Sequence, residues 1–118
     1  MHLFTLDREV SWEALGEGVS RKVMSYSPDI MVVKVRFERG SMGVPHQHPH
    51  TQISFVESGS FEYTIGGQTV ILASGDTCLI PPDTLHGCRC LEKGVLIDSF
   101  TPVRTDFLPT QTRPSDSR

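Results

Sequence analysis

The sequence has few of the features that mark exported, membrane or nucleic-acid-binding proteins. It has three cysteines, and an odd number fits a reducing cytoplasm better than a disulfide framework. Its longest apolar runs are too short to span a membrane, and its first residues lack the basic and apolar segments of a signal peptide. Acidic residues outnumber basic ones by 14 to 11, so a basic face for nucleic acid is not indicated. We therefore expect a cytoplasmic protein that binds neither nucleic acid nor a membrane.

Helix-type periodicity is also scarce. The 118 residues, of which 37% are hydrophobic, suffice for one domain with its own core. The only plausible helix is a short one over residues 11–15, where Ser11 could act as the N-cap. We predict a single domain over residues 1–108. Residues 109–118 contain no apolar side chain and are expected to form a loose polar tail.

Short alternating segments between Gly and Pro residues dominate instead. In residues 31–37, Met31, Val33, Val35 and Phe37 share one face, which is typical of a half-buried strand. Further strands are expected at 53–57, 61–65, 68–72, 77–80 and 94–100, with Gly66-Gly67 as a hairpin turn. Many short strands with close turns predict an all-β fold, an antiparallel sandwich or barrel.

The stretch HQHPHTQ, residues 46–52, holds three of the five histidines. Because side chains two apart on a strand share a face, His46 and His48 can reach one cation. Gln52 has the same parity, and His86 begins another candidate strand. Three imidazoles and one oxygen suit Zn, Ni, Fe, Mn or Co, although such histidines can also be ordinary loop residues. A neutral amide in place of a carboxylate leaves the site more positive and more attractive to an anion.

A second group of candidate residues lies near the end of the chain. Leu96, Asp98 and Phe100 share one strand face, and an inward Asp is costly unless it is paired or functional. The alternative for Asp98 is a capping or salt-bridged carboxylate at a strand end. Arg104 follows a proline, so its guanidinium could fold back over the barrel mouth and bind a carboxylate in a bidentate manner. Its alternative is a solvated surface residue.

The spacing of these residues resembles the two cupin motifs. The first motif corresponds to Gly40, His46, His48, Gln52 and Gly59, and the second to Gly75, Pro81 and His86, with fifteen residues between them. The resemblance implies a cupin double-stranded β-helix, or jelly-roll barrel, with one divalent metal ion inside. Two positions depart from the pattern: Asp83 stands where Gly is usual and Cys90 where Asn is frequent. Neither is a ligand position.

Three further patterns resemble a narrower group, the pectin degradation proteins. They are Trp-x-x-Leu-Gly-x-Gly-Val from Trp12, His-Pro-His-x-Gln at 48–52 and Ile-Pro-Pro-x-x-x-His-Gly at 80–87, within a resemblance that covers residues 12–108. This group opens the ring of 4,5-unsaturated uronates from pectin or alginate breakdown, as a metal-dependent isomerase. The resemblance also implies a homodimer and a small anionic sugar as substrate.

The resemblance assigns roles residue by residue. It implies His46, His48, Gln52 and His86 as metal ligands and Asp98 as the catalytic acid/base. Phe100 and Arg104 line the substrate site, and Arg104, which would hold the substrate carboxylate, is counted with Asp98 among the catalytic residues. His50 has no ligand role in the cupin pattern, and we expect it at the edge of the site, orienting a neighbour or contacting substrate.

Other functions stay open at this stage. Cupins with this ligand set include iron-dependent dioxygenases, and a non-catalytic sugar- or metal-binding module would need no positioned acid/base. A soft site built from His86, Cys88 and Cys90 is a weaker alternative, because buried reduced cysteines are common. The metal itself is open among Ni, Zn, Fe and Mn.

Overall fold

The computed structural model describes residues 2–109 of the chain, and within them the regular structure is almost entirely β. Eight strands run in the order β1 (Glu13–Gly16), β2 (Val19–Ser27), β3 (Ile30–Phe37), β4 (Met42–His46), β5 (Thr51–Ile65), β6 (Gln68–Ala73), β7 (Thr77–Ile80) and β8 (His86–Thr101). Two 3₁₀ turns flank them, η1 (Asp7–Glu9) and η2 (Thr105–Phe107). No helix in this part of the chain has the length and apolarity needed to cross a membrane.

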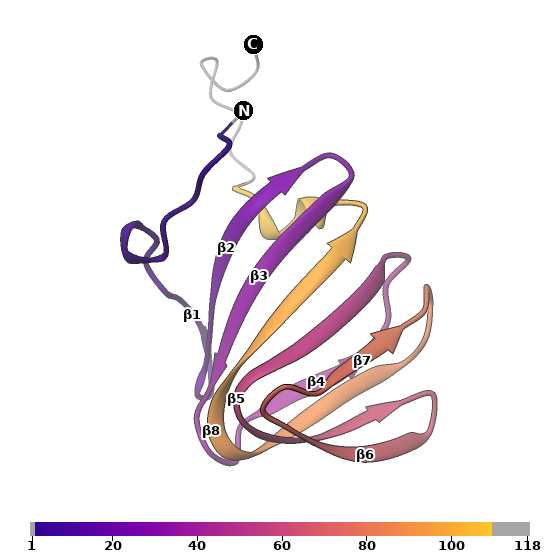
Figure 1. The fold of residues 1–118 in the computed structure, drawn as a ribbon. Coiled ribbons are helices and arrows are strands. Elements are labelled where there is room, and N and C mark those ends of the chain that lie inside the picture. The colour runs from indigo at the N-terminus through magenta and orange to yellow at the C-terminus, as the bar shows by residue number, and fades with distance from the viewer. Residues whose placement is uncertain (1, 110–118) are drawn as a thin grey trace.

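All strand pairings are antiparallel, and the two longest strands organise the fold. The sheet order is β1-β2-β3-β8-β5-β6, with β4 added to β8 and β7 added to β5. The second half of β8 pairs with β3, whereas its first half pairs with β4. In the same way, β5 pairs with β7 near its start and with β6 near its end. Because β5 and β8 each serve both layers, the sheet folds over on itself into the jelly-roll barrel that we expected (Figure 1).

The bend in β5 and β8 depends on two glycines. A Cβ on Gly59 would lie 2.4 Å from the carbonyl oxygen of Glu92, and one on Gly94 would lie 2.0 Å from that of Ser58. Gly59 also has a φ of 81°, a conformation that other residues avoid. The register between the two strands shifts around Ser58, as it does at a β-bulge. Figure 1 shows both ribbons curving sharply.

The core lies between the two layers. The alternation predicted for residues 31–37 is confirmed, since Met31, Val33 and Phe37 are buried. Phe37 packs edge-on against Phe61, with ring centroids 5.2 Å apart. Burial of such side chains supplies most of the driving force for folding.

Two strand predictions need correction. Residues 53–57 and 61–65 are not separate strands ended by Ser58-Gly59-Ser60, because the bulge bends a single strand, β5, instead of ending it. The predicted strand 94–100 is likewise the second half of β8, which already begins at His86. Because hydrogen bonding between strands can continue past a glycine at a bulge, composition alone predicts more strand ends than there are.

The predicted helix over residues 11–15 is wrong. Residues Glu13–Gly16 form β1, which pairs with β2, and the only helical turn nearby is the 3₁₀ turn Asp7–Glu9. A helix of five residues gains too few hydrogen bonds to offset its nucleation cost. A tight turn joins β1 to β2, so the two strands pair and no helix forms. The turn contains Gly16, Glu17 and Gly18, all with positive φ. The predicted tail lies outside the described residues apart from Pro109.

Candidate active site

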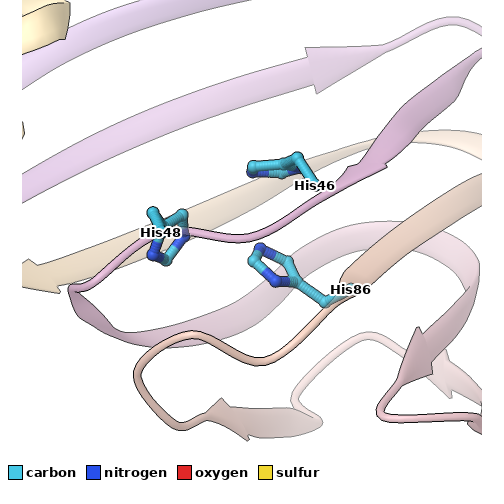
Figure 2. A group of neighbouring side chains, drawn as sticks. All are labelled: His46, His48 and His86. Atoms are coloured by element: carbon cyan, nitrogen blue, oxygen red, sulfur yellow. The ribbon is translucent and has the colours of Figure 1, made fainter.

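Three histidines from two segments come together; His48 and His86 are buried, whereas His46 is exposed. His46 ends β4, His48 follows in the loop, and His86 begins β8 (Figure 2). His46 and His86 are direct partners in the β4–β8 register. Gly87 allows that approach, because a Cβ there would lie 2.8 Å from the carbonyl oxygen of Gly43. The fold thus brings together the residues of the two sequence motifs.

Each of these imidazoles is oriented through its Nδ1 atom. His46 Nδ1 lies 2.9 Å from the Val44 carbonyl oxygen, and His86 Nδ1 lies 2.8 Å from that of Thr84. His48 Nδ1 is 3.2 Å from the carbonyl oxygen of His50. A carbonyl only accepts, so Nδ1 donates in each case and the Nε2 lone pair is free to bind a metal.

The cluster fits a metal ion. The candidate ligand atoms of His46, His48 and His86 all lie within 4.8 Å of one another. His86 Nε2 is buried with no hydrogen-bond partner among the described residues, which is costly unless something binds there. Burial lowers the pKa of His86 to about 4, so its imidazole is neutral near pH 7, the form that coordinates metals.

Gln52 adds an oxygen to the same cluster. Its Oε1 atom lies 2.9 Å from His48 Nε2. With Nδ1 of His48 donating to a carbonyl, two lone pairs face each other at this distance, so a proton or a cation must lie between or beside them. Metal–ligand bonds of about 2.1 Å at right angles place two ligand atoms about 3 Å apart. The predicted ligand set His46, His48, Gln52 and His86 is therefore assembled in one place.

Asp98 lies on the inner face of β8, opposite Ser54 of β5. Its side chain is buried, and Ser54 Oγ donates a hydrogen bond of 2.6 Å to Asp98 Oδ1. Burial raises the pKa of Asp98 to about 6, while hydrogen bonds from Ser54 and Gln52 oppose that rise. No cation pairs directly with this carboxylate in the described part of the chain, so it is not the salt-bridged residue that we considered as its alternative.

Arg104 is buried, not solvated. Its guanidinium lies 5.1 Å from the ring centroid of Phe100 and 4.1 Å from that of Phe107. Asp106 accepts two hydrogen bonds from it, from Nε at 3.0 Å and from Nη2 at 2.8 Å. Because a guanidinium has five N–H donors, three remain for another partner. The same contact lowers the pKa of Asp106.

A partly open cavity is lined by most of these groups. Its volume is about 160 Å³, and its lining includes His46, Gln52, His86, Asp98, Phe100 and Arg104. A larger hollow of about 460 Å³ lies between the N-terminal segment and β2, but it contains none of the candidate site residues. The chemistry is therefore concentrated in the smaller cavity inside the barrel.

The remaining candidates lie at the margin of this cavity or outside it. His50 contributes its main-chain oxygen to His48, and its own imidazole is not part of the three-histidine cluster. Cys88 and Cys90 are buried but do not join the cluster either, and burial raises the pKa of Cys88 to about 12. Protonated thiols are poor ligands, so the soft-site alternative gains no support.

Sequence reasoning missed three polar residues. Ser54 and Tyr63 form a buried hydrogen-bonded group with Asp98, and Arg21 lines the cavity with its guanidinium 4.1 Å from the Phe107 ring centroid. For Ser54 a signal existed, because it has the inward parity of Gln52. Arg21 gave none, because its inward direction depends on the pairing of β2 with β3.

Comparison with known proteins places this geometry in a family. Residues 33–98 match the cupin domain. The chain is 46% identical to the pectin degradation protein KdgF of Dickeya dadantii (strain 3937), over 92% of this chain and all of that protein. The solved structure of KdgF from Halomonas sp. superposes with a TM-score of 0.88 at 39% identity, covering 92% of this chain and 100% of the other. An RmlC-like cupin from Shewanella frigidimarina NCIMB 400 gives a TM-score of 0.89 at 34% identity, covering 92% and 97%. The chain belongs to the cupin family and, within it, to the pectin degradation proteins.

Proposed function

We propose that this protein is a metal-dependent isomerase that opens the ring of 4,5-unsaturated monouronates to give the linear 5-keto-4-deoxyuronate. One observation carries the proposal: three of the four candidate ligands, His46, Gln52 and His86, line one cavity together with a buried carboxylate and a buried guanidinium, and His48 belongs to the same histidine cluster. Its relationship to a pectin degradation protein supports the substrate class.

The reaction moves protons and breaks one carbon–oxygen bond. The C1 hydroxyl loses its proton, the bond between C1 and the ring oxygen breaks, and the electrons remain on the oxygen attached to C5 as an enolate. A proton then adds to C4, which leaves a ketone at C5 and an aldehyde at C1. Substrate and product have the same composition, so no oxidant is consumed. The chemistry needs a proton carrier and positive charge for the carboxylate and the enolate.

Residues of the cavity can meet each need. Asp98 is the proton carrier, accepting the proton of the C1 hydroxyl and delivering one to C4. Arg104 holds the substrate carboxylate with the donors that Asp106 leaves unused, and the Phe100 ring beneath it closes one side of the cavity. Substrate binding excludes water from this small space and strengthens these polar contacts.

His46, His48, Gln52 and His86 would hold the metal. A bound divalent ion, for which Ni, Zn, Fe and Mn are the candidates, supplies Lewis acidity that stabilises the developing enolate. Since no ligand is a carboxylate, the site keeps the full charge of the ion. Because none of these four ligands is a base that could carry the proton, proton transfer is left to Asp98.

We also propose the cytoplasm as its compartment and a homodimer as its assembly. The three cysteines Cys78, Cys88 and Cys90 are all free, as expected in a reducing compartment. Ile53 of β5 and Leu79 of β7 pair on the outer face of the sheet and are 47% and 57% exposed, which suits contact with a second copy. Light scattering of the purified protein would measure its mass directly.

The deciding experiment compares reaction products with and without oxygen. The metal-loaded protein is incubated with unsaturated monouronate, and the product is identified by NMR. An isomerase gives the linear 5-keto-4-deoxyuronate at the same rate under nitrogen. An iron-dependent dioxygenase would stop when oxygen is removed. A non-catalytic binding module would bind the uronate in calorimetry while leaving its double bond intact.

A further inference from the structure

Ser54 lies at the centre of the polar residues behind the candidate metal site. It is fully buried on β5, with Asp98 as its partner on β8. Its hydroxyl donates to Asp98 Oδ1 at 2.6 Å, and Gln52 Nε2 donates to Ser54 Oγ at 3.1 Å. Tyr63 OH lies 3.0 Å from the same oxygen. A serine hydroxyl has one proton and two lone pairs. Since the proton goes to Asp98, Tyr63 must donate, and the hydroxyl is saturated.

This arrangement gives the Gln52 amide a preferred direction. Ser54 can only accept from Gln52, so the amide nitrogen points to Ser54 and the amide oxygen points to His48. A reversed amide would set its oxygen against the Ser54 oxygen, which has no proton to offer, and with a cation bound it would also point its NH₂ toward that cation. Both contacts are unfavourable in a buried, metal-loaded site.

We propose that Ser54 is a positioning residue, which fixes the oxygen of the Gln52 amide toward the metal and holds the Asp98 carboxylate with the same hydroxyl. This inference rests on the metal site of the proposed function. It adds that the ligand and the proton carrier share one orienting group, Ser54, beside the hydrogen bond of the Gln52 amide to Asp98. Tyr63 completes the group by donating the third hydrogen bond.

Zinc affinity tests this role without using the reaction. Zn²⁺ is titrated against a competing chromophoric chelator for the wild type and for Ser54→Ala, Gln52→Ala and the double variant. We expect Ser54→Ala to weaken Zn²⁺ binding by about 10–100-fold, the usual effect of removing a group that orients a metal ligand. When Gln52 is already replaced by Ala, Ser54→Ala should not weaken Zn²⁺ binding any further, because the amide that Ser54 orients is absent.

Ser99→Ala is the matched control. Ser99 neighbours Asp98 on β8, but its side chain has the opposite parity. The Zn²⁺ affinity of Ser99→Ala should therefore equal that of the wild type. Circular dichroism and thermal unfolding of each metal-free variant show whether the fold is intact. Equal Zn²⁺ affinity of folded Ser54→Ala and wild type would overturn the inference. Equal losses in the Gln52→Ala and wild-type backgrounds would also overturn it, as would a wild type that does not bind Zn²⁺.

A second measurement needs no variant at Ser54. In the Zn²⁺-loaded wild type, NMR should find both protons of the Gln52 amide protected from solvent exchange. Exchange at the rate of a free glutamine would contradict the inference even if Ser54→Ala failed to fold. The proposed function is tested separately by uronate turnover. If Ser54→Ala weakens Zn²⁺ binding but the wild type does not turn over uronate, the proposed function is wrong and the role of Ser54 stands. If the wild type turns over uronate but Ser54→Ala binds Zn²⁺ as well as the wild type does, the function stands and the role of Ser54 is wrong.

Discussion

The rings of His46 and His86 lie with their centroids 4.4 Å apart and their planes tilted by 52°, because the two residues are partners across β4 and β8. They belong to different sequence motifs, and the jelly roll is what joins them. His48 completes the cluster from the loop that follows β4, with its ring centroid 4.9 Å from that of His86. The candidate metal site is therefore a consequence of strand register.

Replacing His86 should abolish metal binding. In His86→Ala, one of three imidazoles is lost from a cluster that no acidic side chain of residues 2–109 supplements. We expect the metal content after loading and desalting to fall from one ion per chain to near zero, as measured by mass spectrometry of the metal. The control is His50→Ala, which retains the main-chain oxygen that orients His48. Loss of metal in the control, with retention in His86→Ala, would contradict this assignment.

Replacing Asp98 by Asn should remove turnover but not metal. Asn keeps the shape of the side chain and can still accept the hydrogen bond from Ser54, but it cannot carry a proton. We expect kcat on unsaturated uronate to fall by about 100-fold or more, as for a general acid/base, while the metal content is unchanged. The loss of double-bond absorbance measures the rate. Full turnover would show that another group carries the proton.

Replacing Arg104 by Lys should raise KM more than it lowers kcat. Lysine keeps the charge but loses the planar fork that holds a carboxylate. A loss of about 1.4 kcal/mol of binding corresponds to a tenfold higher KM, which we expect as a minimum. Arg89→Lys is the control, because the side chain of Arg89, in β8, is 51% exposed and pairs with Glu62. An unchanged KM in Arg104→Lys would show that Arg104 does not hold the substrate carboxylate.

Gly59 and Gly67 should respond differently to alanine. Both have positive φ, 81° and 85°, but a Cβ would meet main-chain oxygen at 2.4 Å in Gly59 and nothing within 4 Å in Gly67. Gly67→Ala should cost about 1–2 kcal/mol of unfolding free energy, from backbone strain alone. Gly59→Ala adds the clash at the bend and should cost about 3 kcal/mol or more. Urea unfolding measures both, and equal losses would show that the bend tolerates a side chain.

Much of the fold could be predicted from local pattern. Alternation in residues 31–37 identified a strand and its buried face, and Gly66-Gly67 identified the hairpin between β5 and β6. Motif spacing also named the four residues that the structure brings together around the candidate metal. Asp83, which stands where the motif usually has Gly, has a φ of 58°, a conformation that Asp tolerates better than most residues.

The rest depends on register and turns that local pattern does not encode. Ser54 shares the inward parity of Gln52, but its partner Asp98 is known only from the pairing of β5 with β8. Asp106 reaches back to Arg104 only because η2 turns the chain there. The bulge at Ser58 hides the continuity of β5, since Gly and Ser usually indicate an end.

The most direct test of the account is turnover of unsaturated monouronate by one preparation before chelation, after chelation and after metal is restored. Double-bond absorbance gives the rate, and NMR gives the product. We expect ring opening in the first sample, loss of most activity in the second, and recovery when a divalent ion is added back to the four-ligand site. Undiminished turnover in the chelated, metal-free protein would contradict it, and so would an unchanged substrate in the fully metal-loaded one.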